Sequence, residues 1–260
     1  MGKPQCGRYD AARGELPPVE TSPMNELRQT LLARGASLVG FADLRPLPAD
    51  VRDDLPFGVS IAVALFTDVV EKIGDGPTQQ YLTEYRRVNE LLDRLGRIAT
   101  EYLRQRGYRA EPLAATITDH DAVKYFAPLP HKTVATRAGL GWVGRCALVV
   151  TEQFGSAVRF ASVLTDAPLP TGTPIETSRC GDCTACVDKC PGHAPTGRDW
   201  QAQLPPADMF DRYACYRSIR SVSAKAQIDG TICGMCIAAC PWTQRYLQHA
   251  CGRVSRARQP

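Results

Sequence analysis

Two runs of cysteines towards the C-terminal end constrain this chain more than any other feature. The first run reads Cys180-Gly-Asp-Cys183-Thr-Ala-Cys186-Val-Asp-Lys-Cys190-Pro191, which has the spacing C-x2-C-x2-C-x3-C-P. This spacing is typical of bacterial ferredoxins, in which the fourth cysteine of the run binds the other of two 4Fe-4S clusters. The run therefore predicts cluster chemistry and the movement of single electrons.

A shorter copy of the run follows about forty residues later. It reads Cys233-Gly-Met-Cys236-Ile-Ala-Ala-Cys240-Pro241 and lacks the first cysteine of the pattern. Two 4Fe-4S clusters need four thiolates each, and the two runs supply all but one of them. Cys215 lies between the runs and is the natural remaining ligand. We predict that Cys180, Cys183, Cys186 and Cys240 bind the first cluster, and that Cys190, Cys215, Cys233 and Cys236 bind the second.

The cysteine content argues against a disulfide framework. The chain has eleven cysteines in 260 residues, and its N-terminal segment lacks the apolar region of a secretory signal peptide. In a reducing compartment cysteines serve metal or redox chemistry. Zinc sites also use C-x2-C pairs, but they do not need the C-x3-C-P ending. Cys6, Cys146 and Cys251 remain as spare thiols, and we expect a cytoplasmic protein without a membrane span.

The segments before the cysteines predict a mixed domain of helices and strands. A helix is expected from Ser22-Pro23 to Gly35, and a longer one is expected from Thr78 to Gly107, with apolar residues at steps of three and four. An almost continuously apolar segment, 59–66, predicts a strand buried on both faces. The alternation indicates an α/β fold, with α+β as the alternative. Further strands are expected at 37–42, 108–115, 147–151 and 158–164, and a short helix is expected at 133–137.

The chain divides into four parts by composition. Residues 1–22 are rich in Gly, Pro and charge and are expected to form a flexible arm. Residues 23–170 form the predicted α/β domain for cofactor and substrate, and a turn-rich linker, 168–174, follows it. Residues 175–250 form the predicted ferredoxin-like domain that binds both clusters. Residues 251–260 form a basic tail.

A glycine-rich motif lies within the predicted α/β domain, before the cysteine runs. Gly139-Leu-Gly141-Trp-Val-Gly144 spells G-x-G-x-x-G. A dinucleotide-binding fingerprint follows a strand and opens a helix, whereas here a helix is expected before the motif and a strand after it. Two interpretations stay open. The motif is a glycine turn between helix and strand, or it is a loop whose backbone packs against a flat cofactor.

The residues around this motif resemble those of epoxyqueuosine reductases. The segment 130–144, PHKTVATRAGLGWVG, is similar to the segment that leads into the AGLGW-[IV]-G loop of that family. Gly155-Ser156 and the segment 163–169 continue the similarity, and both cysteine runs follow, ending in Cys240-Pro241-Trp242. The resemblance extends over roughly residues 25–250.

The resemblance implies a fold, cofactors and a reaction. The N-terminal α/β domain would bind cobalamin, as a related domain does in reductive dehalogenases, and the two clusters would relay electrons to the cobalt. The enzyme would be an iron-sulfur oxidoreductase that performs a reductive deoxygenation or a related reduction. Its electron donor would be a flavodoxin or a ferredoxin. The candidate cofactor-binding residues are then Lys132, Gly139, Gly141, Trp142 and Gly144.

The chain departs from the family pattern at the proton donor. Epoxyqueuosine reductases carry an acidic donor six residues before a Glu-Arg pair, and here His131-Lys132 occupies the place of that pair and Tyr125 the place of the donor. Tyrosine is a weaker acid than a carboxyl group, with an ordinary pKa near 10, but it can donate a proton, and reductive dehalogenases similarly use a tyrosine. Asp121 could substitute, and His131 is a further candidate. Tyr125 is equally well interpreted as a buried core aromatic.

A second departure concerns length. Full epoxyqueuosine reductases continue into a region of helical repeats that helps to hold transfer RNA, whereas this chain ends about twenty residues after Cys240. The resemblance therefore allows a tRNA partner but gives it less support. Two other functions stay open: an electron-transfer protein whose N-terminal domain docks a partner enzyme, and a reductive dehalogenase-like enzyme, which Tyr125 favours.

Overall fold

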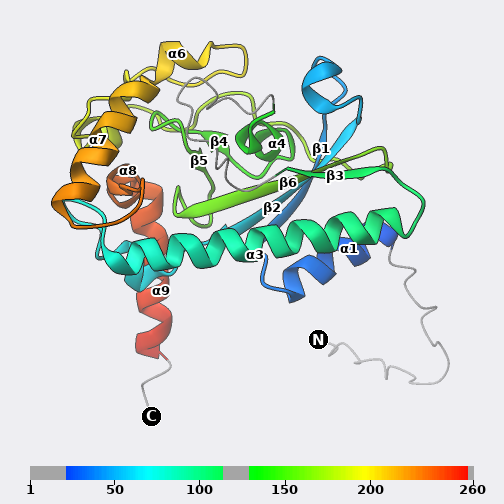
Figure 1. Ribbon diagram of the computed structural model, residues 1–260, viewed down its shortest axis with the longest axis horizontal. Coiled ribbons are helices and arrows are strands. Elements are labelled where there is room, and N and C mark those ends of the chain that lie inside the picture. The colour runs from blue at the N-terminus through cyan, green and yellow to red at the C-terminus, as the bar shows by residue number, and fades with distance from the viewer. Residues whose placement is uncertain (1–21, 114–128, 257–260) are drawn as a thin grey trace, which may run out of the picture.

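The computed structural model describes residues 22–113 and 129–256, with side chains up to residue 249. Its centre is a sheet of four strands, β1 (Leu38–Asp43), β2 (Phe57–Ala64), β3 (Ala110–Leu113) and β6 (Val158–Thr165) (Figure 1). The strand order is β1-β2-β6-β3, and every neighbouring pair is antiparallel. In this register Val59 of β2 lies between Phe41 and Val163.

The mixed α and β composition that the sequence predicts is confirmed. The antiparallel pairing corresponds to the α+β alternative, because an α/β sheet is built mainly from parallel strands. The strand expected at 59–66 is β2, which begins two residues earlier and is buried from Gly58 to Val63. Its burial on both faces follows from the helices and loops that cover the sheet on each side.

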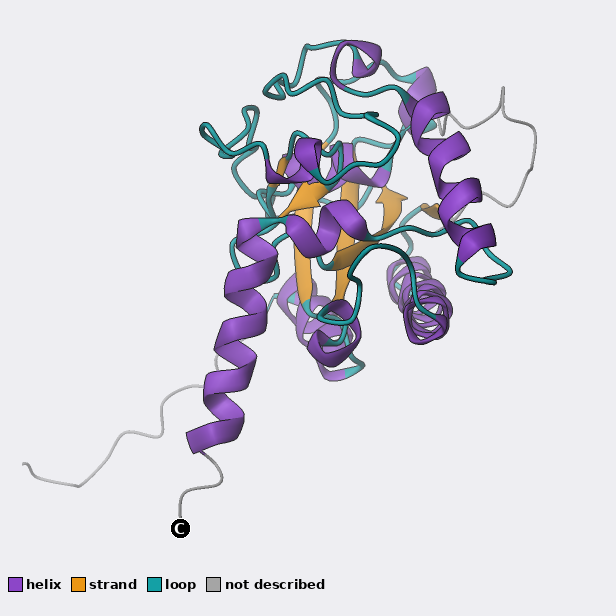
Figure 2. Ribbon diagram, turned by 90° about the vertical axis from the view of Figure 1, so that its left-hand side faces the viewer, coloured by secondary structure: helices purple, strands orange, loops and turns teal. Residues whose placement is uncertain are grey.

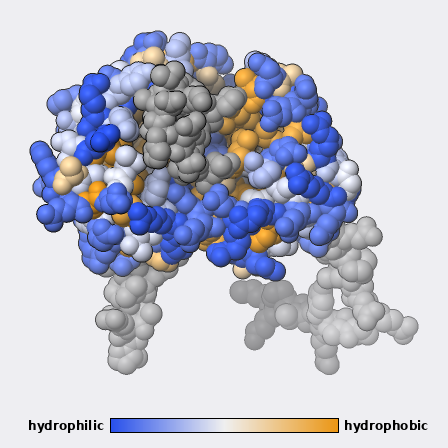
Figure 3. All heavy atoms as spheres, in the orientation of Figure 1, coloured by the Kyte–Doolittle hydropathy of each residue, from blue (hydrophilic) through white to orange (hydrophobic). Residues whose placement is uncertain are grey.

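Two helices cover one face of the sheet. α1 (Pro23–Ala33) begins after Ser22, whose side chain accepts a hydrogen bond from the Asn25 amide, and α3 (Gln79–Arg104) is capped in the same way by Thr78. The apolar stripe of α3 packs on β2, β3 and β6, and its outer side is mostly hydrophilic (Figure 3). Both helix starts, and the glycine near the end of α1, lie where the sequence predicts them.

The other face of the sheet carries α4 (His131–Arg137), which contacts β1, β2 and β6. Phe41 and Val163 belong to the core beneath α3, whereas their neighbours Ala42 and Leu164 belong to a second cluster with Val134 of α4. This alternation follows from the two-residue period of a strand. A small hairpin, β4 (Trp142–Val143) and β5 (Val149–Val150), follows α4.

The cysteine-rich segment forms short helices joined by loops. It contributes α5 (Ala185–Asp188), α6 (Pro206–Met209), α7 (Arg212–Lys225), α8 (Met235–Ala239) and α9 (Pro241–Arg256), and α9 projects from the body (Figures 1 and 2). The main hydrophobic core includes Ile228, Ile237 and Leu247 together with residues of α1, α3 and the sheet. The core therefore extends across the boundary between the two domains that the sequence predicts.

The remaining described elements are short. η1 (Asp50–Arg52) lies between β1 and β2, and α2 (Thr67–Val70) follows β2. The hydroxyl of Tyr246 in α9 donates a hydrogen bond to the carbonyl of Leu65, 3.0 Å away, just after β2. Among the described helices, none is long and apolar enough to cross a membrane.

Candidate functional site

A single pocket of about 260 Å³ is lined by five cysteines, of which one is Cys146 and the other four come from the two cysteine runs. Cys180, Cys183 and Cys186 come from the first run, and Cys240 comes from the end of the second. These four are the ligands that the sequence predicts for the first cluster. Cys186 and Cys240 are each 8% exposed, whereas Cys180 and Cys183 are half-buried on the open side. The chain thus brings together the interleaved ligand set that a 4Fe-4S cluster requires.

The hairpin after the glycine-rich motif closes the pocket. A Cβ placed on Gly144 would lie 3.5 Å from the Sγ atoms of both Cys146 and Cys180, and 2.8 Å from a methyl group of Val150. A larger residue at position 144 would push into the pocket wall. Gly144 therefore contributes to the site by leaving room beside the thiols.

Three arginines surround this pocket. Arg145 donates a hydrogen bond to the carbonyl of Cys183 at 3.0 Å and forms an ion pair with Asp199. Arg179 and Arg245 also line the pocket, and the Arg245 guanidinium lies 4.6 Å from the ring centroid of Trp242. Cationic groups at this distance stabilise added negative charge, so they favour the reduced state of any cluster bound here.

Three of the four ligands predicted for the second cluster, Cys190, Cys215 and Cys233, are neighbours at α7. Cys215 lies in the first turns of α7, and both Cys190 and Cys233 are electrostatic neighbours of its thiol. Burial, together with these neighbours, raises the pKa of Cys215 to about 11. Bound iron would reverse this effect, because a coordinating thiol loses its proton. The Sγ of Cys190 accepts a hydrogen bond from the Ala194 amide at 3.4 Å.

Cys146 lies between the two predicted ligand sets. Its thiol interacts with Cys186, a predicted ligand of the first cluster, and with Cys236, a predicted ligand of the second. The hydrogen bond with Cys186 lowers the pKa of Cys146, but the hydrogen bond with Cys236 and burial outweigh it, and the pKa lies well above its ordinary value. The sequence leaves Cys146 as a spare thiol, because it belongs to neither run. Its position directly after the glycine-rich motif is the only sequence signal of its place in the site.

The thiols are not arranged as ligands of a single metal ion. Within the described part of the chain, no group of three His, Cys, Asp or Glu side chains has that arrangement.

The glycine-rich motif runs from the end of α4 into the β4–β5 hairpin, so the turn interpretation describes its backbone. Gly139 has a φ of 72°, and a Cβ there would lie 2.7 Å from the Thr173 carbonyl oxygen. A Cβ on Gly141 would collide with the carbonyl oxygen of Val150. Both glycines thus permit close approach of the chain to itself. A cofactor contact at Gly139, Gly141 and Gly144 stays a prediction.

Trp142, inside the glycine-rich motif, is fully buried and packs against the end of the second cysteine run. Its ring meets that of Trp242 at a centroid distance of 5.0 Å, and its Nε1 has no hydrogen-bond partner within the described residues. These contacts are those of an aromatic side chain packed in the core. The contact of Trp142 with a cofactor stays a prediction.

The candidate catalytic residues lie at the edge of the described chain. His131 is the first residue of α4, and its Nδ1 lies 3.0 Å from the hydroxyl of the buried Ser162 in β6. Lys132 is half-buried, and its burial lowers the pKa of its ammonium group while the nearby Cys146 raises it. Tyr125 and Asp121 lie outside the described residues, as does Cys6, and Cys251 lies in α9 beyond the described side chains.

The similarities in sequence to known proteins are modest and partial. No protein-family model matches the chain. The epoxyqueuosine reductase of Aliivibrio fischeri is 34% identical over 125 residues, which cover 45% of this chain and 30% of that protein. The epoxyqueuosine reductase of Vibrio cholerae is 27% identical over 184 residues, which cover 65% of this chain and 44% of that protein. The chain thus spans less than half the length of these curated relatives.

Solved structures of two kinds of enzyme have folds similar to that of this chain. A reductive dehalogenase structure described as suggesting a mechanism for B12-dependent dehalogenation matches 92% of this chain and 35% of its own, with a TM-score of 0.64 and 17% identity. An epoxyqueuosine reductase bound to an epoxyqueuosine-modified tRNA stem loop matches 84% of this chain and 64% of its own, with a TM-score of 0.54 and 21% identity. The chain is thus related in sequence to the epoxyqueuosine reductases and has a fold that they share with reductive dehalogenases.

Proposed function

We propose that this chain is an iron-sulfur oxidoreductase that carries single electrons through two 4Fe-4S clusters to a reaction site in its N-terminal domain. One observation carries this proposal. Cys180, Cys183 and Cys186 share a pocket with Cys240, which lies in the other cysteine run. This crossed arrangement is typical of proteins that hold two clusters close enough for electrons to pass between them.

The protein residues around the first pocket would tune the cluster. Cluster potentials range over roughly −700 to +450 mV and depend on hydrogen bonds, charge and solvent access. Arg145 holds the backbone at Cys183, and its side chain is only 12% exposed. Arg245 also lines the pocket, as does Arg179, which forms an ion pair with Glu152 at 2.8 Å. These cations raise the potential, whereas the two half-buried cysteines leave one side of the pocket open to solvent.

Cobalamin is the second cofactor of this proposal. Cobalamin would supply a cobalt centre able to attack or reduce the substrate. Its support is the fold shared with a protein described as B12-dependent, together with the relationship to epoxyqueuosine reductases. Gly139, Gly141 and Trp142 contact other parts of the chain in the described structure, and their contact with cobalamin stays a prediction.

The proposed reaction is a reductive deoxygenation or a related reduction. Removal of an epoxide oxygen consumes a pair of electrons and a pair of protons, and the oxygen leaves as water. The electrons would come one at a time from a low-potential donor through the clusters. Tyr125 or Asp121 would supply a proton, and His131, held by its contact with Ser162, is the third candidate.

The test is anaerobic reconstitution with iron and sulfide, followed by addition of cobalamin and a low-potential reductant. Absorption and electron paramagnetic resonance spectra should show two 4Fe-4S clusters, and a corrinoid should remain bound through gel filtration. Turnover of an epoxyqueuosine-containing tRNA stem loop is then measured. Loss of all corrinoid on the column would contradict the cobalamin part, and absence of clusters would contradict the whole proposal.

A reductive dehalogenase-like activity is a second candidate. The structural match to reductive dehalogenases has a higher TM-score, 0.64, than the match to epoxyqueuosine reductases, 0.54, and the tyrosine at position 125 favours the same chemistry. Halogenated aromatic compounds should therefore be assayed beside the tRNA stem loop. Turnover of either substrate with only an electron donor present would exclude a simple electron-transfer protein.

A further inference from the structure

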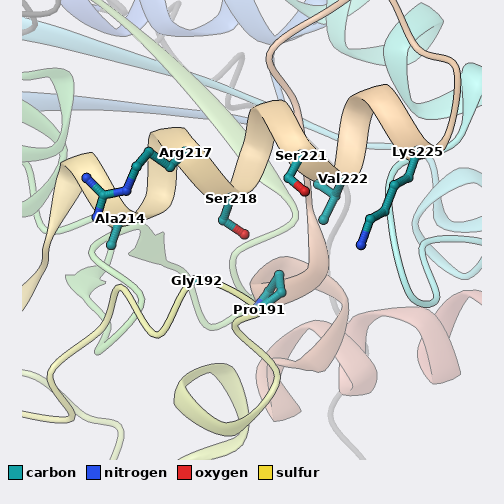
Figure 4. Close-up of a pocket in the computed structure, with 8 residues that line it drawn as sticks. All are labelled: Pro191, Gly192, Ala214, Arg217, Ser218, Ser221, Val222 and Lys225. Carbon is teal, nitrogen blue, oxygen red and sulfur yellow. The ribbon is translucent and has the colours of Figure 1, made fainter.

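A basic cleft lies on the surface beside the predicted second cluster. It has a volume of about 350 Å³ and runs between α7 and the Pro191–Gly192 loop. Figure 4 shows Ser218, Ser221 and Lys225 projecting from α7, with the loop passing beside the helix. Arg217 lines the cleft as well, and none of the described residues that line it is acidic. The surface of the cleft thus offers cations and hydroxyl groups to a ligand.

All charged side chains on α7 are positive, and two of them lack an ion-pair partner among the described residues. The helix contains four cationic residues and no acidic ones. Arg217 and Lys225 are exposed and form no ion pair with any described residue. Arg220 contacts the ring and the hydroxyl of Tyr216. Asp211 caps the N-terminus of α7, and its carboxylate accepts a hydrogen bond from the Ala214 amide at 2.9 Å. The two free cations therefore remain available to an anionic surface.

The walls of the cleft are the segments that carry predicted cluster ligands. The loop follows Cys190 directly, and Cys215 lies on α7 itself. The two walls touch, because a Cβ on Gly192 would lie 2.6 Å from the Cβ of Ser218 and 2.8 Å from the carbonyl oxygen of Ala214. A macromolecule seated in this cleft would lie within a few side chains of the second cluster.

We infer that this cleft, with Arg217 and Lys225 among its lining residues, docks an acidic electron-donor protein that carries a flavin or an iron-sulfur centre. The inference rests on the proposed function and names the entry point of its electrons. One electron leaves the reduced donor and enters the oxidised second cluster, and no proton is needed. Opposite charges steer the donor to the cleft and set its orientation. A nucleic acid would also complement the positive charge, but it carries no electrons, so a position beside the second cluster does not favour it.

The test compares two double variants of the full chain, each reconstituted with iron and sulfide. R217Q/K225Q removes the cleft charge, and R94Q/R97Q removes two exposed cations from α3, outside the cysteine-rich segment. Binding of a purified acidic flavodoxin is measured by calorimetry at several salt concentrations, and cluster reduction by that flavodoxin is followed by stopped-flow absorption. An RNA stem loop is titrated in parallel.

We expect R217Q/K225Q to weaken flavodoxin binding about tenfold at low salt, to flatten its salt dependence and to slow cluster reduction by a similar factor. R94Q/R97Q should behave as the unaltered chain. Equal binding by both variants, or loss of RNA binding alone in R217Q/K225Q, would overturn the docking site. A chain that assembles clusters and reacts with dithionite but never binds the flavodoxin would overturn this inference and leave the proposed function standing. A chain without clusters would overturn both.

Discussion

The ring of Trp142 meets the ring of Trp242 edge to face, with centroids 5.0 Å apart and an interplanar angle of 74°. Trp142 belongs to the glycine-rich motif, and Trp242 follows the last cysteine of the second run. Edge-to-face pairs of this kind add to the stability gained from burial alone. The contact fixes the two motifs against each other at the wall of the cluster pocket.

Replacement of Trp142 should separate its packing role from any cofactor role. Trp142→Ala should lower the free energy of unfolding by about 3–5 kcal/mol, because it leaves a cavity against Trp242. Trp142→Phe keeps the ring contact and removes an indole N–H that has no partner among the described residues, so its cost should be about 1 kcal/mol or less. Urea unfolding measures both values. A large loss in the Phe variant would indicate an unrecognised partner for the indole.

Cysteine replacements should test the ligand assignment. Cys215→Ala should lower the iron content of the reconstituted chain from about eight atoms to about four, because one cluster loses a ligand. Cys146→Ala should retain about eight, although this thiol contacts two predicted ligands. Iron and sulfide analysis with electron paramagnetic resonance gives the counts. If Cys215→Ala kept its full iron content and Cys146→Ala lost iron, Cys146 and not Cys215 would be the cluster ligand.

Lys132 should make stability depend on pH. Its burial lowers the pKa of the folded state below the ordinary value of about 10.4, so the unfolded chain binds the proton more tightly. Stability should therefore rise as the pH rises from the folded pKa towards about 10.4. Lys132→Met should be more stable near pH 7 by about 1 kcal/mol and should show a flatter profile. Urea unfolding across this pH range checks the sign, and a profile that falls with pH would contradict it.

Gly155 should be intolerant of a side chain. It has a φ of 56°, and a Cβ would collide with the backbone of Trp242 and Thr243 at the start of α9. Gly155→Ala should cost about 2 kcal/mol or more and should lower the cluster content, because it displaces the helix that follows Cys240. Gly96→Ala is the matched control.

Gly96 lies inside α3 with open space where a Cβ would lie, so alanine there should stabilise the chain by about 1 kcal/mol. Thermal unfolding and iron analysis compare the two glycine variants. A Gly155→Ala variant as stable as Gly96→Ala would show that α9 can shift away from this contact without loss.

Local features of the fold could be predicted from the sequence, whereas pairings over long distances could not. The caps at Ser22 and Thr78 and the stripe along α3 depend on residues a few positions apart. The direction of pairing between β2 and β6 depends on how the intervening chain returns to the sheet. Periodicity carries no information on that return path, so α/β and α+β could not be separated.

In the candidate site, too, some features could be predicted from spacing in the sequence and contacts between distant residues could not. The ligand set with Cys240 followed from a spacing pattern, and the structure places those four cysteines in one pocket. The place of Cys146 could not be predicted, because its neighbours Cys186 and Cys236 are distant in sequence. The glycines at 139 and 141 face Thr173 and Val150, and neither contact could be derived from the motif.

The shared pocket also has a consequence for biogenesis. The ribosome delivers Cys180, Cys183 and Cys186 well before Cys240, so three thiols of the first site emerge while the fourth is still being synthesised. The nascent chain can form its sheet and α3 first, since those elements precede the cysteines. Complete ligation of a cluster at this site would have to wait until Cys240 has been synthesised.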